Sequence, residues 1–165
     1  MALISAICVP LSQMVIRGYL IHESSAAYAG YWEAMIRLST GYLMLATTTL
    51  GVYYLPRLSE LTNVQDIKKE IYLGYKLIFP LAVFGGIIIY AIKDWIIQLL
   101  FSAAFLPMRE LFLWQMMGDS LKIGSWILAY LMLGKAMTKL FIVTEITFTC
   151  SSIVLTYLCT QYFGF

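Results

Sequence analysis

The chain has 165 residues, of which 61% are hydrophobic and only 12% are charged, and its mean hydropathy is +0.82. Soluble domains carry about a quarter charged residues, so this composition excludes an ordinary soluble domain and indicates an integral membrane protein. The formal net charge is +2 and no basic run is interleaved with aromatic residues, which argues against nucleic-acid binding. The three cysteines lie in apolar stretches without metal-ligand spacing, so we expect neither a metal site nor a cofactor.

Five apolar stretches are long enough to cross a bilayer, which takes about 20 residues per helix. In chain order they cover residues 2–21, 32–55, 75–92, 111–133 and 140–162. Pro10 and Pro80 are expected to kink the first and third spans, and Pro56 is expected to close the second. We therefore predict an all-α, polytopic transmembrane helical bundle of about five spans, which forms a single transmembrane domain over residues 1–165.

The connections between the spans differ in charge. Residues 56–74 and 134–139 hold five Lys or Arg, and Lys76 at the adjoining span end makes six, whereas the connections on the other side hold two. Cytoplasmic loops are enriched in Lys and Arg, so we predict that 56–74 and 134–139 are cytoplasmic. Thr62-Asn63 predicts a helix start within the first of these loops. The segment from Asp94 to Pro107 predicts either a short helix at the outer membrane interface or a continuation of the third span.

The stretch "WQMMGDSLKIGSW", residues 114–126, places Asp119 and Lys122 near the middle of the fourth span. Residues three apart share a helical face, so the two charges can neutralise each other, and Gln115 lies on the same stripe. A polar stripe on an apolar helix must face protein or water rather than lipid. Two interpretations remain open, namely an ion pair that holds two helices together and the lining of a hydrated transport cavity.

Three further charged positions lie within the spans. Arg17 either extends to the interface or faces inward, where its guanidinium suits a phosphate group. Arg37 and Glu33, four residues apart, form either an interfacial pair or part of the cavity. Glu145 starts a polar stripe typical of helix packing, with proton or ion coupling as the alternative role. The stripe continues through Thr149, Ser152 and Thr156.

Two other features bear on helix contacts and on enzymatic activity. The small residues from Ala46 to Gly51 predict a close contact between helices. His22 lies in a predicted loop without a partner pattern, and no GxSxG, HExxH or P-loop motif occurs. We therefore expect that the chain is not an enzyme.

Three segments resemble the Wzx-type polysaccharide flippases of the MATE-like multidrug/oligosaccharidyl-lipid/polysaccharide exporter (MOP) superfamily. They are "YYLPRLSEL" from Tyr53, "LLFSAAF" from Leu99 and "MRELFLWQMMGDSLKIGSW" from Met108. Ser102 departs from the glycine that many relatives carry after the phenylalanine. Relatives are built as two lobes, and the chain resembles most of the second, C-terminal lobe, with the N-terminal lobe absent. Since apolar spans reach both chain ends, we expect a fragment of a larger transporter, with a small intact membrane protein as the alternative.

The resemblance implies a function in polysaccharide biosynthesis at the bacterial inner membrane. It implies flipping of an undecaprenyl-pyrophosphate-linked oligosaccharide, such as an O-antigen or enterobacterial common antigen unit, by alternating access. The implied partners are this lipid-linked glycan, membrane lipids, the missing N-terminal lobe and polysaccharide polymerase machinery. Arg17 and Lys122 are then expected to bind the pyrophosphate, with Asp119 positioning Lys122.

Two alternatives differ in the residues that they make important. In a cation-coupled small-molecule exporter of the same fold, Asp119 and Glu145 would carry the coupling ion. In an accessory subunit, the charged residues would serve helix assembly alone.

Overall fold

The computed structural model describes residues 2–23 and 25–163. Within these residues it consists of helices and short connections, which confirms the predicted all-α class. The elements in chain order are α1 (Ala2–Glu23), α2 (Ala26–Thr49), the π-helix η1 (Leu50–Tyr54), α3 (Leu55–Glu60), α4 (Val64–Ala91), α5 (Lys93–Leu100), the 3₁₀ helix η2 (Ala103–Glu110), α6 (Leu111–Gly134) and α7 (Thr138–Phe163).

Three of the described helices are long and apolar enough to cross a membrane. They are Ile4–Glu23 within α1, Val64–Ala91 and Thr138–Tyr162 within α7. Helices α2 and α6 have 24 residues each, and about 20 suffice to cross a bilayer, but charged residues interrupt their apolar sequence. The count of five spans therefore stays a prediction for these two helices.

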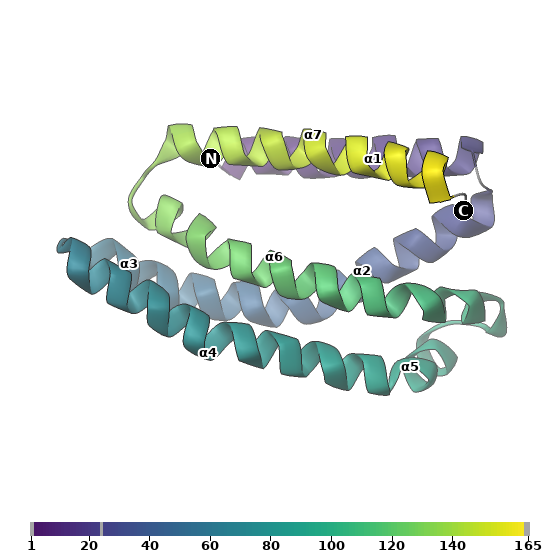
Figure 1. Ribbon diagram of the computed structural model, residues 1–165, viewed down its shortest axis with the longest axis horizontal. Coiled ribbons are helices and arrows are strands. Elements are labelled where there is room, and N and C mark those ends of the chain that lie inside the picture. The colour runs from purple at the N-terminus through teal and green to yellow at the C-terminus, as the bar shows by residue number, and fades with distance from the viewer. Residues whose placement is uncertain (1, 24, 164–165) are drawn as a thin grey trace. The chain divides into compact units, whose positions relative to one another are not determined.

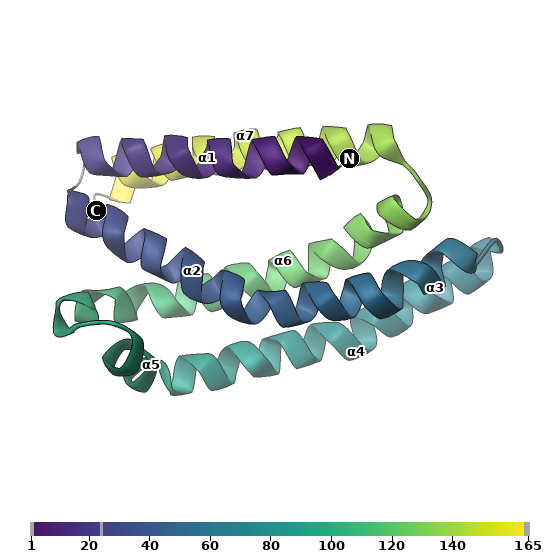
Figure 2. The same ribbon diagram turned by 180° about the vertical axis from the view of Figure 1, so that it is seen from behind.

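The chain divides into two compact units, which are described separately. The terminal unit comprises Met1–Glu33 and Ala136–Phe165, and the central unit comprises Ala34–Lys135. In the terminal unit α1 lies alongside α7, as both views show (Figures 1 and 2). Its buried core contains Ile16, Leu20 and Ala29, against which Trp32 and Ile153 pack.

In the central unit α4 packs along α6, and η1 and α3 pack against α6 as well (Figure 1). The core of this unit contains Leu50, Tyr54, Leu58 and Ile127. Gly124 lets α6 approach α4 closely, because a Cβ atom at this position would lie 3.3 Å from the Phe79 ring. Small residues at such contacts are typical of membrane helices, which associate by close packing.

The second helical segment continues past Pro56, where we expected it to end. The π-helical turn η1 follows α2 directly, and α3 then runs to Glu60 with Pro56 in its first turn. Proline is tolerated in the first turn of a helix because its missing N–H would have no partner there. The π-helical turn shifts the hydrogen-bond pattern just before the proline, so the segment continues as a new helix.

The predicted helix start at Thr62-Asn63 is confirmed, but the helix is longer than expected. The Asn63 side chain accepts a hydrogen bond from the Gln65 backbone N–H at 3.1 Å, as a helix cap does. The helix then continues without interruption through the predicted third span as α4. Much of the predicted loop 56–74 is thus helical.

The segment after α4 forms a separate helix rather than a continuation of it. The backbone breaks at Ile92, and α5 covers Lys93–Leu100. This helix ends at Leu100, before Pro107, which lies inside the following 3₁₀ helix η2. The short-helix interpretation is confirmed, while its position at the outer interface stays a prediction.

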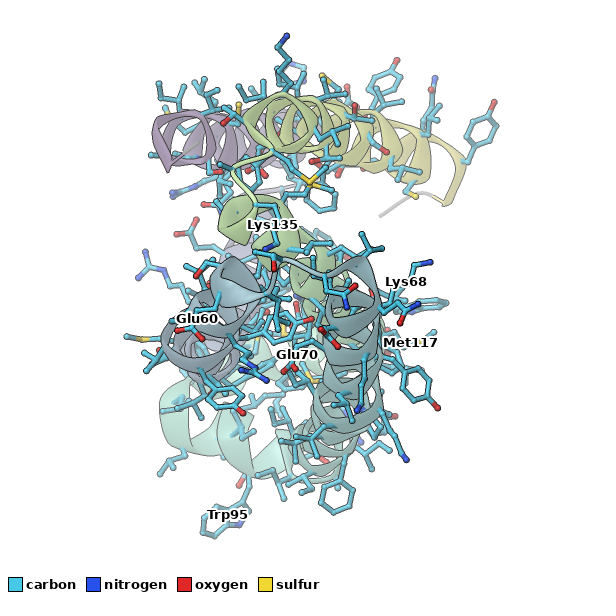
Figure 3. All side chains as sticks on the ribbon, turned by 90° about the vertical axis from the view of Figure 1, so that its left-hand side faces the viewer. Glu60, Lys68, Glu70, Trp95, Met117 and Lys135 are labelled. Atoms are coloured by element: carbon cyan, nitrogen blue, oxygen red, sulfur yellow. The ribbon has the colours of Figure 1, made fainter. Side chains whose placement is uncertain are left out.

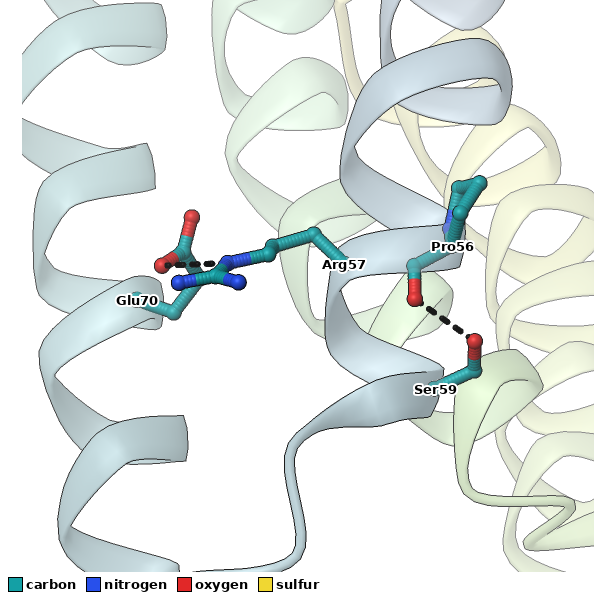
Figure 4. Close-up of polar contacts among 4 residues, drawn as sticks. All are labelled: Pro56, Arg57, Ser59 and Glu70. Carbon is teal, nitrogen blue, oxygen red and sulfur yellow. Dashed lines mark hydrogen bonds and ion pairs between the residues drawn. The ribbon is translucent and has the colours of Figure 1, made fainter.

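Polar contacts join the helix ends around the connection between α3 and α4. Arg57 Nε on α3 lies 3.7 Å from Glu70 Oε2 on α4, and the Ser59 hydroxyl donates to the Pro56 carbonyl at 2.6 Å (Figure 4). The Lys135 amine donates to the Leu61 carbonyl. Figure 3 shows Lys135 and Glu70 at this end of the central unit. These contacts fasten α6 and α4 to the end of α3.

Candidate functional site

A cluster of polar side chains lies between α2 and α6 in the central unit. The Asp119 cluster consists of Asp119 and Gln115 on α6 and Ser39 and Tyr42 on α2. Both hydroxyls donate to Asp119 Oδ2, and Gln115 Nε2 donates to Asp119 Oδ1 at 3.1 Å. Gln115 Nε2 also lies 3.3 Å from Ser39 Oγ. The four side chains therefore form a connected hydrogen-bond network.

The sequence periodicity of both helices brings these groups together. Ser39 and Tyr42 are three residues apart and Gln115 and Asp119 are four apart, so each pair shares one helical face. Asp119 and Ser39 are each only 4% exposed. A buried carboxylate is costly unless it accepts hydrogen bonds, and here three donors from two helices reach it. The cluster can hold a negative charge and join α2 to α6 without a cation.

The expected ion pair between Asp119 and Lys122 is not formed in the described part of the chain. The Lys122 side chain is exposed, and its Nζ lies 5.5 Å from the centre of the Trp126 ring. The carboxylate of Asp119 is directed instead to its donors on α2. The Lys122 side chain extends instead toward Trp126, one turn further along α6.

Arg17 forms an ion pair in the terminal unit. Its Nη1 lies 3.3 Å from Glu33 Oε2, and the two side chains are 57% and 30% exposed. The structure brings Glu33 to Arg17 on α1, and the pairing of Glu33 with Arg37 that the spacing indicates stays a prediction. Arg37 is exposed and belongs to the central unit. That Arg17, Arg37 and Lys122 face one cavity stays a prediction.

The polar stripe of α7 lies on the partly buried face of that helix. Glu145, Thr149, Ser152 and Thr156 are all intermediate in exposure. Ser152 donates to the Thr149 carbonyl at 2.9 Å and Thr156 to the Ser152 carbonyl at 2.8 Å, so these two hydroxyls bond to their own helix. Within the described residues Glu145 has neither an ion pair nor a hydrogen-bonding partner for its carboxylate. Its predicted coupling role stays a prediction.

The predicted close contact at residues 46–51 is confirmed. The Tyr130 hydroxyl on α6 donates to the Thr47 carbonyl at 3.1 Å. A Cβ atom at Gly51 would lie 3.7 Å from the same hydroxyl. The small residues thus let an aromatic side chain of α6 reach the backbone of α2.

Sequence reasoning missed Ser39 and Tyr42, although both complete the Asp119 cluster. Their spacing of three on an apolar helix was the available signal. Hydroxyl side chains on one helix often bond to their own backbone, so their position did not reveal a carboxylate on another helix. Among the described residues no group of three or more His, Cys, Asp or Glu side chains gathers in a way that could hold a metal ion.

The chain is similar to two curated proteins, both named lipid III flippase, from Escherichia coli (strain K12) and Shigella flexneri. Each is 34% identical to it over 147 residues, which are 89% of this chain and 35% of the relative. The chain thus spans about a third of the length of these relatives. No family model and no solved structure matches it. Both relatives are named as flippases, in agreement with the expectation of a non-enzymatic protein. Together with its apolar helices and flippase-like segments, this similarity over most of the chain supports its resemblance to the Wzx-type flippases.

Proposed function

We propose that the chain is part of a flippase that moves an undecaprenyl-pyrophosphate-linked oligosaccharide across the bacterial inner membrane. An O-antigen or enterobacterial common antigen unit is the proposed glycan. The similarity to the lipid III flippases supports the reaction type. The exposed amine of Lys122, within the apolar helix α6 and without an ion pair to Asp119, is the observation that carries the proposal.

The chemistry of the substrate explains why such a cation is useful. A pyrophosphate group is an anion, and an anion loses hydration when it leaves the aqueous phase. A lysine amine offers three donors and a positive charge without a fixed geometry, so it can follow a moving phosphate. Arg17 keeps further guanidinium donors beside its contact with Glu33 and serves the same ligand. Because Lys122 and Arg17 are two separate side chains, the headgroup can release them one at a time and leave the site.

Alternating access supplies the movement in this proposal. The two lobes of the whole transporter rock about a central cavity, so that the headgroup site opens first to the cytoplasm and then to the periplasm. The chain contributes one side of this cavity, and the N-terminal lobe contributes the other. Residues 56–74 and 134–139 lie on the cytoplasmic side.

The test uses the full-length protein that contains this chain. We expect Lys122→Ala and Arg17→Ala to lower the amount of surface glycan at least about tenfold, since a lost charge-assisted hydrogen bond is worth about 1.5–3 kcal/mol. Lys139→Ala, a lysine of the predicted loop side, serves as the matched control and should leave surface glycan unchanged. Membrane abundance of every variant is measured by immunoblotting.

Wild-type surface glycan in both Lys122→Ala and Arg17→Ala would exclude the cavity assignment. Proton- or sodium-dependent efflux of small cations, lost on Asp119→Asn or Glu145→Gln while surface glycan persists, would instead identify a small-molecule exporter.

A further inference from the structure

The Asp119 cluster determines how close the Asp119 carboxylate lies to the Lys122 amine. Asp119 and Lys122 are three residues apart on α6, a spacing at which opposite charges attract on a helix. Yet the carboxylate lies against α2, and the amine lies over the Trp126 ring. The groups that bind the carboxylate on the side of α2 are the hydroxyls of Ser39 and Tyr42.

We propose that Ser39 and Tyr42 are positioning residues that keep Lys122 available to a phosphate anion. By holding the Asp119 carboxylate against α2, they prevent it from neutralising the charge of Lys122, one turn away on α6. The identity of the anion as the substrate pyrophosphate rests on the proposed function. The competition itself rests on the geometry of the central unit.

The arrangement of donors is suited to this competition. Both hydroxyls donate to the same carboxylate oxygen, and Gln115 occupies the other oxygen at 3.1 Å. Ser39 is 4% exposed, so water does not compete for its hydrogen bond. Gln115 also contacts Ser39, which ties the donor and the carboxylate into one ring of contacts. Asp119 is thus held from both sides of the α2–α6 interface.

Removal of the two hydroxyls should release the carboxylate. In the double variant Ser39→Ala with Tyr42→Phe, Asp119 keeps only the Gln115 donor and turns toward Lys122. We measure acetylation of the Lys122 amine by the water-soluble acetyl ester of N-hydroxysulfosuccinimide, using mass spectrometry of the full-length protein in lipid nanodiscs. We expect the rate to fall about tenfold, because a nearby carboxylate favours the protonated, unreactive amine.

Rescue separates this role from simple helix packing. Asp119→Asn in the double-variant background removes the charge that captures Lys122, so the acetylation rate should return to the wild-type value. If the cluster only packs α2 against α6, the third substitution removes yet another contact and restores nothing. Tyr42→Phe alone keeps the Ser39 hydrogen bond and should give an intermediate rate, which preserves the test if the double variant accumulates poorly.

The matched controls each remove one hydroxyl from the central unit without touching Asp119. The Ser120 hydroxyl donates to the Met116 carbonyl at 2.8 Å, and the Tyr75 hydroxyl donates to the Gly124 carbonyl at 2.9 Å. Ser120→Ala and Tyr75→Phe should therefore leave the acetylation rate of Lys122 unchanged.

Surface glycan provides the second readout, and its outcomes are separable. The proposal expects loss in the double variant and recovery with Asp119→Asn. An acetylation rate that is unchanged in the double variant, or a Lys122 amine that does not react in the wild-type protein, overturns the positioning role. The expected acetylation pattern with normal surface glycan throughout overturns the proposed function and leaves the positioning role intact.

Discussion

The hydroxyl groups of two tyrosines in the central unit differ in their hydrogen bonding. The Tyr130 hydroxyl donates to the Thr47 carbonyl of α2. The Tyr54 hydroxyl is fully buried and has no hydrogen-bond partner within the described residues. Gly74 makes room for it, because a Cβ atom there would lie 3.1 Å from the hydroxyl oxygen. A satisfied polar group thus lies close to an unsatisfied one in the same core.

We therefore predict opposite results for the two Tyr→Phe substitutions. Tyr130→Phe should destabilise the full-length protein by about 0.6–1.5 kcal/mol, since it removes a net favourable hydrogen bond. Tyr54→Phe should be neutral or stabilising by up to about 1 kcal/mol, since it removes a buried group without a partner. Thermal unfolding in detergent measures both, and Tyr53→Phe, at an exposed side chain, is the control. Equal losses for both variants would contradict this assignment.

The candidate site shows the same limit of single-residue reasoning. Asp119 and Gln115 could be selected from the sequence because polar residues are conspicuous on an apolar helix. Of the two interpretations left open for Asp119 and Lys122, the ion pair is not formed within the described residues, because spacing along one helix is visible in a sequence and proximity to α2 is not.

At the scale of elements, glycine positions determine which helix faces are in contact. On α6, Gly124 faces the Phe79 ring of α4, whereas Gly118 has no atom within 4 Å of a Cβ placed there. Both glycines belong to the same helix, so they share its intrinsic cost in backbone entropy. They differ only in what surrounds them.

We predict that Gly124→Leu destabilises the full-length protein by about 1–3 kcal/mol, because the added side chain overpacks the α4–α6 contact. Gly118→Leu, with the same change of side chain, should not destabilise it. Thermal unfolding in detergent and the fraction of correctly inserted protein provide the measurements. Similar losses at both positions would show that α6 does not contact α4 through Gly124.

The continuation past Pro56 also belongs to this scale. Proline was expected to end the second span, and the observed chain instead passes through η1 into α3. Helix ends that depend on caps, as at Asn63, were predictable because the signal and its hydrogen bond are local. The π-helical turn depends on packing against α6, where Leu50 and Tyr54 are buried, and packing is not a local property.

At the scale of the whole molecule, α4 separates two sets of connections. Its 28 residues extend about 42 Å at 1.5 Å per residue, which exceeds the hydrocarbon thickness of about 30 Å. Lys68 lies near its start, and Arg109 lies in η2, beyond its end. If α4 spans the membrane, these two exposed residues face opposite aqueous sides.

We predict the sidedness from the excess of basic residues in 56–74 and 134–139. In a cysteine-free full-length protein, a membrane-impermeant maleimide should label Arg109→Cys in intact spheroplasts. It should label Lys68→Cys only after the membrane is opened. The reverse pattern would invert the proposed orientation, and labelling of both positions in intact spheroplasts would contradict a membrane-spanning α4.

The sequence alone determined the class of this protein and the composition of its helices. Hydropathy, helix caps and residue spacing depend on neighbouring residues in the chain. The long apolar stretches, the cap at Asn63 and the polar stripe of α6 can therefore be identified without coordinates. The flippase-like segments were likewise identified from short sequence motifs, and the similarity to the lipid III flippases agrees with them.

Only the tertiary structure decided which polar groups meet. Ser39 and Tyr42 lie about eighty residues from Asp119 in the chain, and their contact exists because the fold brings this part of α2 within side-chain reach of α6. In an apolar environment a carboxylate binds the donors that its burial places nearest, and burial is a property of packed helices. The position of the Asp119 carboxylate away from Lys122 follows from that arrangement and not from the spacing of the two residues on α6.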